Sequence, residues 1–345
     1  MKWTMNKEQW RISVAALMLF VCLTGCRKDL CYNHDEHALT VKVDVVADWE
    51  QEWERPYDMD WQGTWDAGFM GRTYDDLRPE VSEGIRALVY RDGQFIAENN
   101  IPATGGRLPL DEGTFDLLFH NNDSEYILID NTTTAAATRA TTRTVTRNGF
   151  MALHEGERTV NQPDMLYGHY LEEYATERTI EPVSLPVLMH PLVYTYLIRY
   201  EFKSGLEYVA LTRGALAGMA ESVYLSDGHT GDDAATVMYD CQMTDFGAEA
   251  VVKSFGVPNY PGDHYTRADG SPATYAMSLD VLLKNGKIIT YDFDVTDQVE
   301  KQPRGGVITV SDIIVDKEEG EEGSGGFEVD VEGWGEYQDI PVPID

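Results

Sequence analysis

The chain has few basic residues for its size. Its 345 residues include 27 lysines and arginines but 59 aspartates and glutamates, so the net charge is −32. A protein that grips nucleic acid needs clustered lysine and arginine to neutralise phosphates. The composition therefore excludes a general nucleic-acid binder. It suits a soluble body that is exposed at a cell surface.

Long hydrophobic runs are also missing. The longest extends from Ile12 to Leu23, about a dozen residues where a membrane-spanning helix needs roughly 20. It follows a basic start and ends in Leu23-Thr24-Gly25-Cys26, the bacterial lipobox pattern. We predict that residues 1–25 are a lipoprotein signal peptide and that Cys26 is lipidated, which anchors the chain without spanning the membrane. The alternative is an ordinary export signal with an accidental cysteine.

Cysteine is scarce, with four in the chain. Cys22 leaves with the signal peptide and Cys26 carries the lipid, so Cys31 and Cys241 remain. An exported protein can form a disulfide, and two thiols allow only one intramolecular pairing. A Cys31–Cys241 bridge and two unpaired thiols are both open. No spacing of cysteine and histidine indicates a zinc site.

The catalytic motifs that a sequence can reveal are absent. There is no G-x-S-x-G elbow, no H-E-x-x-H and no phosphate-binding G-x-x-x-x-G-K-[ST]. The segment at 34–37 (HDEH) could ligate a metal, but a solvated tether behind the anchor explains it equally well. The acidic turn at 227–233 (DGHTGDD) contains no complete calcium loop. We therefore expect that the protein is not an enzyme and that it has no metal site and no cofactor.

Alternation of apolar and polar residues predicts β-strands through most of the chain. In 37–46, Leu39, Val41, Val43 and Val45 alternate with polar residues. Further strands are predicted at 85–90, 94–97, 114–120, 126–129, 193–202, 218–225, 236–241, 275–283 and 288–295. Turn signals separate them, the strongest being Asn285-Gly286. This spacing indicates an all-β sandwich or barrel.

Three segments interrupt this pattern. Residues 131–147 (NTTTAAATRATTRTVTR) are of low complexity and predict a protease-sensitive mobile loop or a hairpin. Residues 164–175 are the best candidate for a short helix. An acidic, glycine-rich linker at 316–326 precedes a terminal strand at 327–334. About 320 mature residues predict two domains, so we divide the chain into a tether at 26–38, an N-terminal half at 39–181 and a C-terminal half at 182–345.

Several stretches carry a family resemblance. They are residues 26–34 (CRKDLCYNH), 113–123 (GTFDLLFHNND), 163–168 (PDMLYG), 215–228 (ALAGMAESVYLSDG) and 326–336 (GFEVDVEGWGE). On these the chain resembles a Bacteroides-type lipoprotein family of unknown function, which is similar to fimbrial anchor and minor fimbrial subunit proteins. The resemblance implies two tandem transthyretin-like, Greek-key β-sandwiches. It also implies a place in the outer membrane, exposed at the cell surface, and a role in a fimbrium and in cell adhesion.

A tryptophan-rich segment stands outside the family pattern. Trp49, Trp53, Tyr57, Trp61 and Trp65 lie within 17 residues. Indoles spaced by four share a face of a local helix, and exposed aromatic rings can stack on sugars or receive a protein partner. The alternative is that they fold inward and cap the open end of the first sandwich. We favour that alternative, because exposed indoles are costly without a partner.

The C-terminus bears on assembly. Ile340, Val342 and Ile344 alternate with Pro341 and Pro343, so the segment could pair only as an edge strand. Fimbrial subunits of the resembled type are thought to join by strand exchange, a form of β-strand addition. A frayed tail is the simpler interpretation. Two functions remain: an anchoring or accessory fimbrial subunit that binds other subunits through sheet edges, or a surface lipoprotein that binds a glycan or host ligand through its tryptophans.

Overall fold

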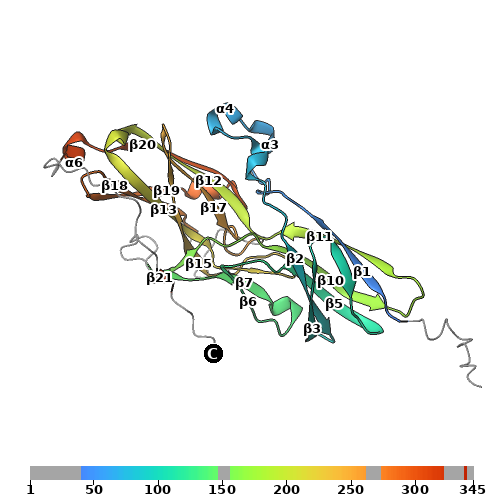
Figure 1. Cartoon of the computed structure of the whole chain (residues 1–345). Helices are drawn as coiled ribbons and strands as arrows, with labels where there is room; N and C mark the ends of the chain where they lie inside the picture. Colours follow the sequence, from blue (N-terminus) through green and yellow to red (C-terminus); the bar gives the residue numbers. More distant parts are fainter. Residues whose placement is uncertain (1–39, 147–155, 262–272, 322–337, 340–345) are drawn as a thin grey trace, which may run out of the picture.

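Strands make up most of the computed structural model, which describes residues 40–146, 156–261, 273–321 and 338–339. Figure 1 shows an elongated molecule, with β1, β3, β5 and β10 gathered at one end and β12, β13, β18 and β20 at the other. The short helices are α3 (Trp61–Thr64), α4 (Ala67–Met70), η1 (Tyr74–Leu77), η2 (Ala135–Ala137), η4 (Leu206–Tyr208), α5 (Thr296–Val299) and α6 (Lys317–Glu321).

The first half is built on one seven-stranded sheet in the order β3-β2-β5-β10-β11-β1-β4. Its strands are β1 (Val43–Trp49), β2 (Gly84–Arg91), β3 (Gln94–Pro102), β4 (Gly105–Leu108), β5 (Gly113–Asn121), β10 (Tyr167–Thr176) and β11 (Val183–Pro191). Ile101 on one edge strand and Leu108 on the other are buried in the same core as Phe115 and Phe119 of the inner strand β5. The sheet therefore curves around that core.

The second half is a sandwich of two sheets. One has the order β16-β17-β12-β20 and the other β19-β18-β13-β15-β9. Their strands are β9 (Arg158–Asn161), β12 (Tyr194–Ser204), β13 (Val209–Ala220), β15 (Ala234–Asp240), β16 (Gln242–Met243), β17 (Gly247–Ser254), β18 (Ala276–Leu283), β19 (Ile288–Asp294) and β20 (Gly306–Ile314). Side chains from both sheets, such as Ile198 of β12 and Leu279 of β18, meet in one large core.

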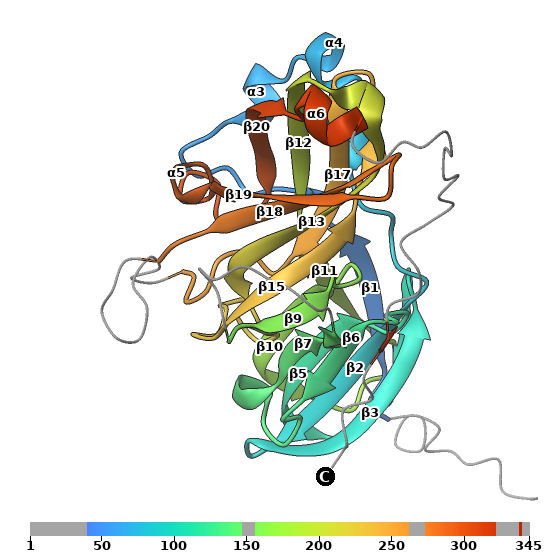
Figure 2. The same ribbon diagram turned by 90° about the vertical axis from the view of Figure 1, so that its left-hand side faces the viewer.

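A small sheet joins the two halves. It has the order β14-β7-β6 and consists of β6 (Ile127–Asp130), β7 (Arg139–Thr142) and β14 (Ser222–Tyr224). Leu88 and Leu118, on the outer face of the seven-stranded sheet, share a core with Ala140 of β7 and Val223 of β14. In Figure 2, β6, β7 and β9 lie between the β2–β5 layer and β15. The last pair is β8 (Val145–Thr146) with β21 (Gln338–Asp339).

The two halves are interleaved along the chain, which corrects the boundary predicted at residue 182. Strand β11, after that boundary, pairs in parallel with β1 in the first sheet. Strand β9, before it, pairs in parallel with β15 in the second half. The chain therefore passes from the first half to the second after β11, at Leu192–Val193. Pairings between strands far apart in the sequence leave no local signal, so alternation could not reveal them.

The all-β class is confirmed: the first half is one sheet curved around its core, and the second half is a sandwich of two sheets. Val43 and Val45 are buried while Asp44 between them is not, as the alternation predicts. Asn285-Gly286 forms the turn between β18 and β19, with Gly286 in the left-handed region at φ +85°.

Two local predictions need correction or narrowing. The helix predicted at 164–175 is wrong, because most of it forms strand β10. That strand carries an irregularity between Leu171 and Tyr174, and Glu173 has φ +53°. A bulge breaks the two-residue period, so the apolar spacing imitates a helix. The Thr/Ala/Arg segment forms the second strand of the β6–β7 hairpin, with Ala140 fully buried; the part beyond residue 146 lies outside the described residues.

Candidate functional site

The tryptophan-rich segment does not form an exposed platform. Residues 53–77, which we call the tryptophan cap, lie over the outer face of the β17–β12–β20 sheet (Figure 1). Trp53 is fully buried, and it packs with Leu197 of β12 and Val307 of β20. The neighbouring residues Ile198 and Ile308 point the other way, into the sandwich core. The cap therefore covers the face of the sheet that the sandwich leaves open.

Within the cap the rings pack on one another. Trp61 and Trp65 lie at the two ends of α3, with ring centroids 6.5 Å apart, so the spacing of four does place them on one face. Trp65 also packs edge-on against Trp53 at 5.8 Å, and its indole N–H donates to the Arg72 carbonyl at 2.9 Å. Trp53 lies 5.1 Å from Tyr74. With these contacts Trp53 is fully buried and Trp61 and Trp65 are partly buried.

Charged side chains attach the cap to the sheet below it. The Arg199 guanidinium of β12 lies between the rings of Phe69 in α4 and Phe246, at 4.5 and 4.1 Å. The Arg199 side chain is 3% exposed, and its guanidinium lies 4.0 Å from the Glu249 carboxylate on β17. Arg72 of the cap forms an ion pair with the same carboxylate. Cation–π contacts that are shielded from water contribute about 2 kcal/mol, so Arg199 is a principal attachment point.

The remaining two aromatic residues of the predicted surface do not join this ring cluster. Trp49 ends β1 and packs edge-on against Tyr167 at 4.9 Å, in the core of the first half. Its indole N–H donates to the Ala103 carbonyl at 2.8 Å. Tyr57 is 48% exposed and lies 6.3 Å from Tyr260. The segment folds inward as we favoured. We predicted that the segment caps the open end of the first sandwich. This is wrong, because the tryptophan cap covers the second half.

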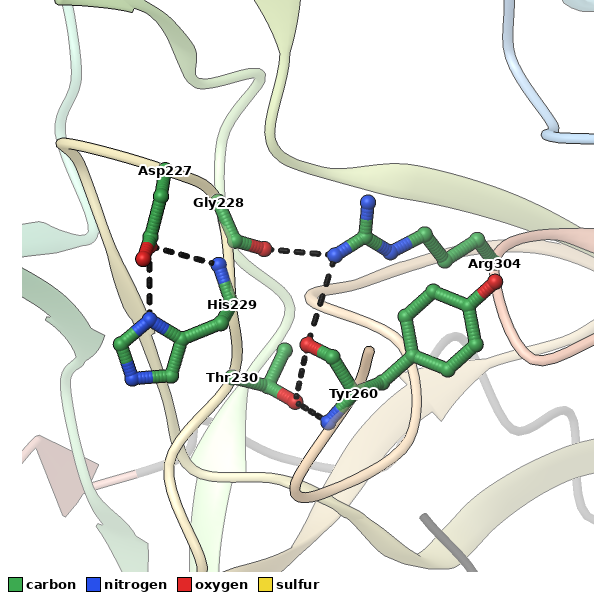
Figure 3. Close-up of polar contacts among 6 residues, drawn as sticks. All are labelled: Asp227, Gly228, His229, Thr230, Tyr260 and Arg304. Atoms are coloured by element: carbon green, nitrogen blue, oxygen red, sulfur yellow. Dashed lines mark hydrogen bonds and ion pairs between the residues drawn. The ribbon is translucent and has the colours of Figure 1, made fainter. Parts of the chain in front are cut away.

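Polar contacts hold together three loops of the second half, at 227–230, Tyr260 and Arg304 (Figure 3). One Arg304 Nη nitrogen donates to the Gly228 carbonyl at 2.6 Å, and the guanidinium stacks 4.5 Å from the Tyr260 ring. The Asp227 carboxylate accepts from the backbone N–H of His229 at 3.1 Å and lies 2.6 Å from the ring nitrogen Nδ1 of the same histidine. Thr230 accepts from the Tyr260 N–H at 2.8 Å. These hydrogen bonds hold the acidic turn at 227–233 in its conformation.

A surface hollow of about 480 Å³ lies beside the place where the two halves meet. It is bordered by Asp76, Asp123, Asp164 and Lys253. Asp123 and Asp164 accept backbone N–H bonds there, from Glu83 and from the turn at 125–126. Within the described ranges, no group of three or more histidines, cysteines or acidic residues is arranged to hold a metal ion. No helix in those ranges is long and apolar enough to cross a membrane.

The other predicted sites fall partly outside the described residues. Cys26, Cys31, the metal-like segment 34–37, the strand at 327–334 and the alternating residues 340–345 all lie there. Cys241 follows β15 and packs against the second core, where burial raises the pKa of its thiol. The Cys31–Cys241 bridge stays a prediction. Of the linker at 316–326, residues 317–321 form helix α6.

Comparison with known proteins gives a consistent set of relatives. Residues 77–240 match the model of a domain of unknown function (DUF5119). A Bacteroides ovatus protein named "Putative fimbrium anchoring subunit Fim4B" is 22% identical, over 95% of this chain and 96% of that protein. The resemblance to a family of unknown function and to fimbrial anchoring proteins is therefore confirmed.

Solved structures support the fold. A Bacteroides ovatus structure described as a putative adhesin superposes with a TM-score of 0.56 at 21% identity, covering 85% of this chain and 98% of that one. The fimbrial anchor protein Mfa2 from Porphyromonas gingivalis gives a TM-score of 0.42 at 12% identity, over 78% and 90% of the two chains. The first of these shows that the two chains share a fold. The DUF5119 match runs from η1 to the end of β15, so it spans the interleaved halves.

Proposed function

We propose that this protein is a lipid-anchored, non-enzymatic anchoring or accessory subunit of a fimbria-like assembly in the outer membrane, and that it binds neighbouring subunits along its sheet edges. The observation that carries the proposal is the similarity to a fimbrium anchoring subunit over nearly the full length of both chains. A likeness of that extent covers both halves and the small sheet between them, so it concerns the whole architecture.

The geometry at the start of the described chain supports attachment at the first half. Thr40 pairs with Thr179 through a backbone bond of 3.0 Å from the Thr179 N–H. Figure 1 places this end of β1 far from the tryptophan cap. From Cys26 to Thr40 an extended chain reaches roughly 45–50 Å. A lipid on Cys26 would hold the first half nearer the membrane and leave the second half farther out.

The glycan-binding alternative loses its structural basis. Stacking on sugar rings needs exposed aromatic faces. Trp53 is fully buried, and Trp49, Trp61 and Trp65 are partly buried against other side chains. Only Tyr57 among the five predicted residues is exposed. We therefore do not propose a glycan or host ligand for this segment.

Lipid anchoring is tested with Cys26→Ser in the native host. The wild-type protein should incorporate labelled palmitate and sediment with outer membranes, whereas the variant should do neither. Cys241→Ser is the matched control, because it removes a thiol without touching the lipobox. Palmitate labelling that persists in Cys26→Ser would refute anchoring at this residue.

The assembly role is tested by isolating the native lipoprotein from cells and identifying the proteins that co-purify. We expect pilin-like subunits in stoichiometric amounts. Isolation as a lone monomer, from cells that carry fimbriae, would contradict the subunit role.

A further inference from the structure

Three long edge strands border the sheets in the described part of the chain. They are β3 in the first half and β19 and β20 in the second, with 9, 7 and 9 residues. A free edge presents unpaired backbone groups that can pair with another chain. The three edges differ in how far they are open, so they are not equivalent places for a partner.

Two glutamine side chains of the same half occupy the first part of the β20 edge, at Val307 and Thr309. The Gln302 amide accepts from the Val307 N–H at 3.0 Å and donates to the Val307 carbonyl at 2.6 Å. Gln298 repeats the pattern two residues on, with both bonds to Thr309 at 3.0 Å. Residues two apart on a strand point their backbone groups to the same side. The two amides therefore occupy successive outward positions, as an added strand would.

The tryptophan cap fixes this closure. The Trp61 indole N–H donates to the Gln302 side-chain oxygen at 2.7 Å. Gln302 is 3% exposed, so its amide is held in a buried network and not left to compete with water. Cap and glutamines together cover the outer face of β20 at Val307 and the first part of its edge, at Val307 and Thr309.

The β19 edge has no outer partner strand among the described residues, but it is acidic. Asp292 and Asp294 are both exposed on it, and β19 carries no basic residue. In a chain with net charge −32, a second acidic chain would meet electrostatic repulsion along this strand. Like charges placed opposite one another across a strand pair are destabilising.

In the described part of the chain no strand pairs with the outer side of β3, and this edge is nearly neutral. Its one charged residue, Glu98, lies 3.9 Å from Arg86 on the neighbouring strand. Phe95 and Ile96 are 40% and 49% exposed. The Phe95 N–H is taken by the Thr133 carbonyl at 3.1 Å, so the open stretch lies at 97–101, before the proline that ends the strand. An extended segment can approach this stretch without charge repulsion, and an apolar residue at its end would reach Phe95 and Ile96, which lie just before the stretch.

We propose that β3, and not β20 or β19, is the edge at which this protein accepts an extended, apolar segment of a neighbouring subunit. This inference rests on the proposed function as a fimbrial subunit. It adds that the β20 edge of the second half is closed to strand addition by Gln298, Gln302 and the cap. Such a chain receives a partner on one half only, which suits a subunit at the end of a polymer.

Two matched substitutions test the choice of edge. Ile96→Lys on β3 and Ile288→Lys on β19 each place a charge at an exposed isoleucine of an edge strand; Ile288 is 51% exposed. We expect Ile96→Lys to reduce co-purifying subunits at least tenfold and Ile288→Lys to leave them unchanged, with both melting temperatures close to wild type. The reverse order of effects, or no effect of Ile96→Lys, would overturn the inference.

Photo-crosslinking in cells separates this inference from the proposed function. p-Benzoylphenylalanine is placed at Ile96, at Ile288 or at Ser311 of β20. A subunit crosslinked from position 96 alone supports the inference. Crosslinks from 288 or 311 alone, or co-purification without any crosslink from 96, would overturn it while the subunit role stands. Failure of subunits to co-purify would contradict both.

The closure of β20 has its own test. In Gln298→Ala/Gln302→Ala, the backbone amides of Val307 and Thr309 should exchange with solvent at least tenfold faster, and the Ser311 probe should begin to crosslink. Gln242→Ala, at an exposed residue of the short strand β16, is the control and should change neither. Unchanged exchange at Val307 and Thr309 would show that the glutamines do not close the edge.

Discussion

Replacement of Trp53 by alanine should destabilise the protein and should not create or remove a ligand site. The indole is fully buried between Trp65, Tyr74 and the sheet residues Leu197 and Val307. Truncation of a buried tryptophan to alanine costs about 3–5 kcal/mol. The indole N–H has no hydrogen-bond partner among the described residues, and removing such a buried donor recovers about 1 kcal/mol. We therefore expect a net loss of roughly 2–4 kcal/mol.

Two companion variants isolate the cause. Trp53→Phe keeps an aromatic ring and removes the unpartnered N–H, so the change should stay below about 1.5 kcal/mol. Tyr57→Ala alters an exposed ring of the same segment and should stay within about 0.5 kcal/mol. Wild type, Tyr57→Ala and Trp53→Phe should have similar stabilities, and Trp53→Ala should be much less stable than all three.

The measurement is urea-induced unfolding of the purified protein followed by far-ultraviolet circular dichroism, which does not depend on tryptophan emission. A midpoint for Trp53→Ala equal to that of Tyr57→Ala would refute the reasoning. It would mean that packing of the Trp53 ring under the cap does not stabilise the second half.

Three further predictions follow from buried groups. Arg199→Met should cost roughly 2–4 kcal/mol in the same unfolding assay, and Arg199→Lys should not restore it, because only the planar guanidinium stacks between two rings beside Glu249. Burial lowers the pKa of His120 to about 4, so between pH 6.5 and 4 the unfolded chain takes up the proton first. Wild type should lose up to about 3 kcal/mol relative to His120→Gln as the pH falls through that window, and parallel pH profiles would contradict this. If Cys31 and Cys241 pair, mass spectrometry without reductant should show the crosslinked peptides; if they do not, Cys241 should resist alkylation until the protein unfolds, because burial raises its thiol pKa.

The sequence alone determined what depends on neighbouring residues. The alternation around Val43 and Val45 predicted a strand with one buried face, and Asn285-Gly286 predicted the turn of a hairpin. Both follow from the two-residue period of strands and from the left-handed conformation that glycine accepts. The lack of basic residues excluded a class of partners without reference to any fold.

Only the tertiary structure decided where those pieces go. The five aromatic residues of the tryptophan-rich segment are close in sequence, yet Trp49 packs in the first half and Trp53 in the second. Nothing in the local sequence marks Gln298 and Gln302 as the residues that close β20, because their partners are set by how α5 packs beside that strand. Strand order and edge closure depend on contacts between distant residues, and a local pattern carries no information about those.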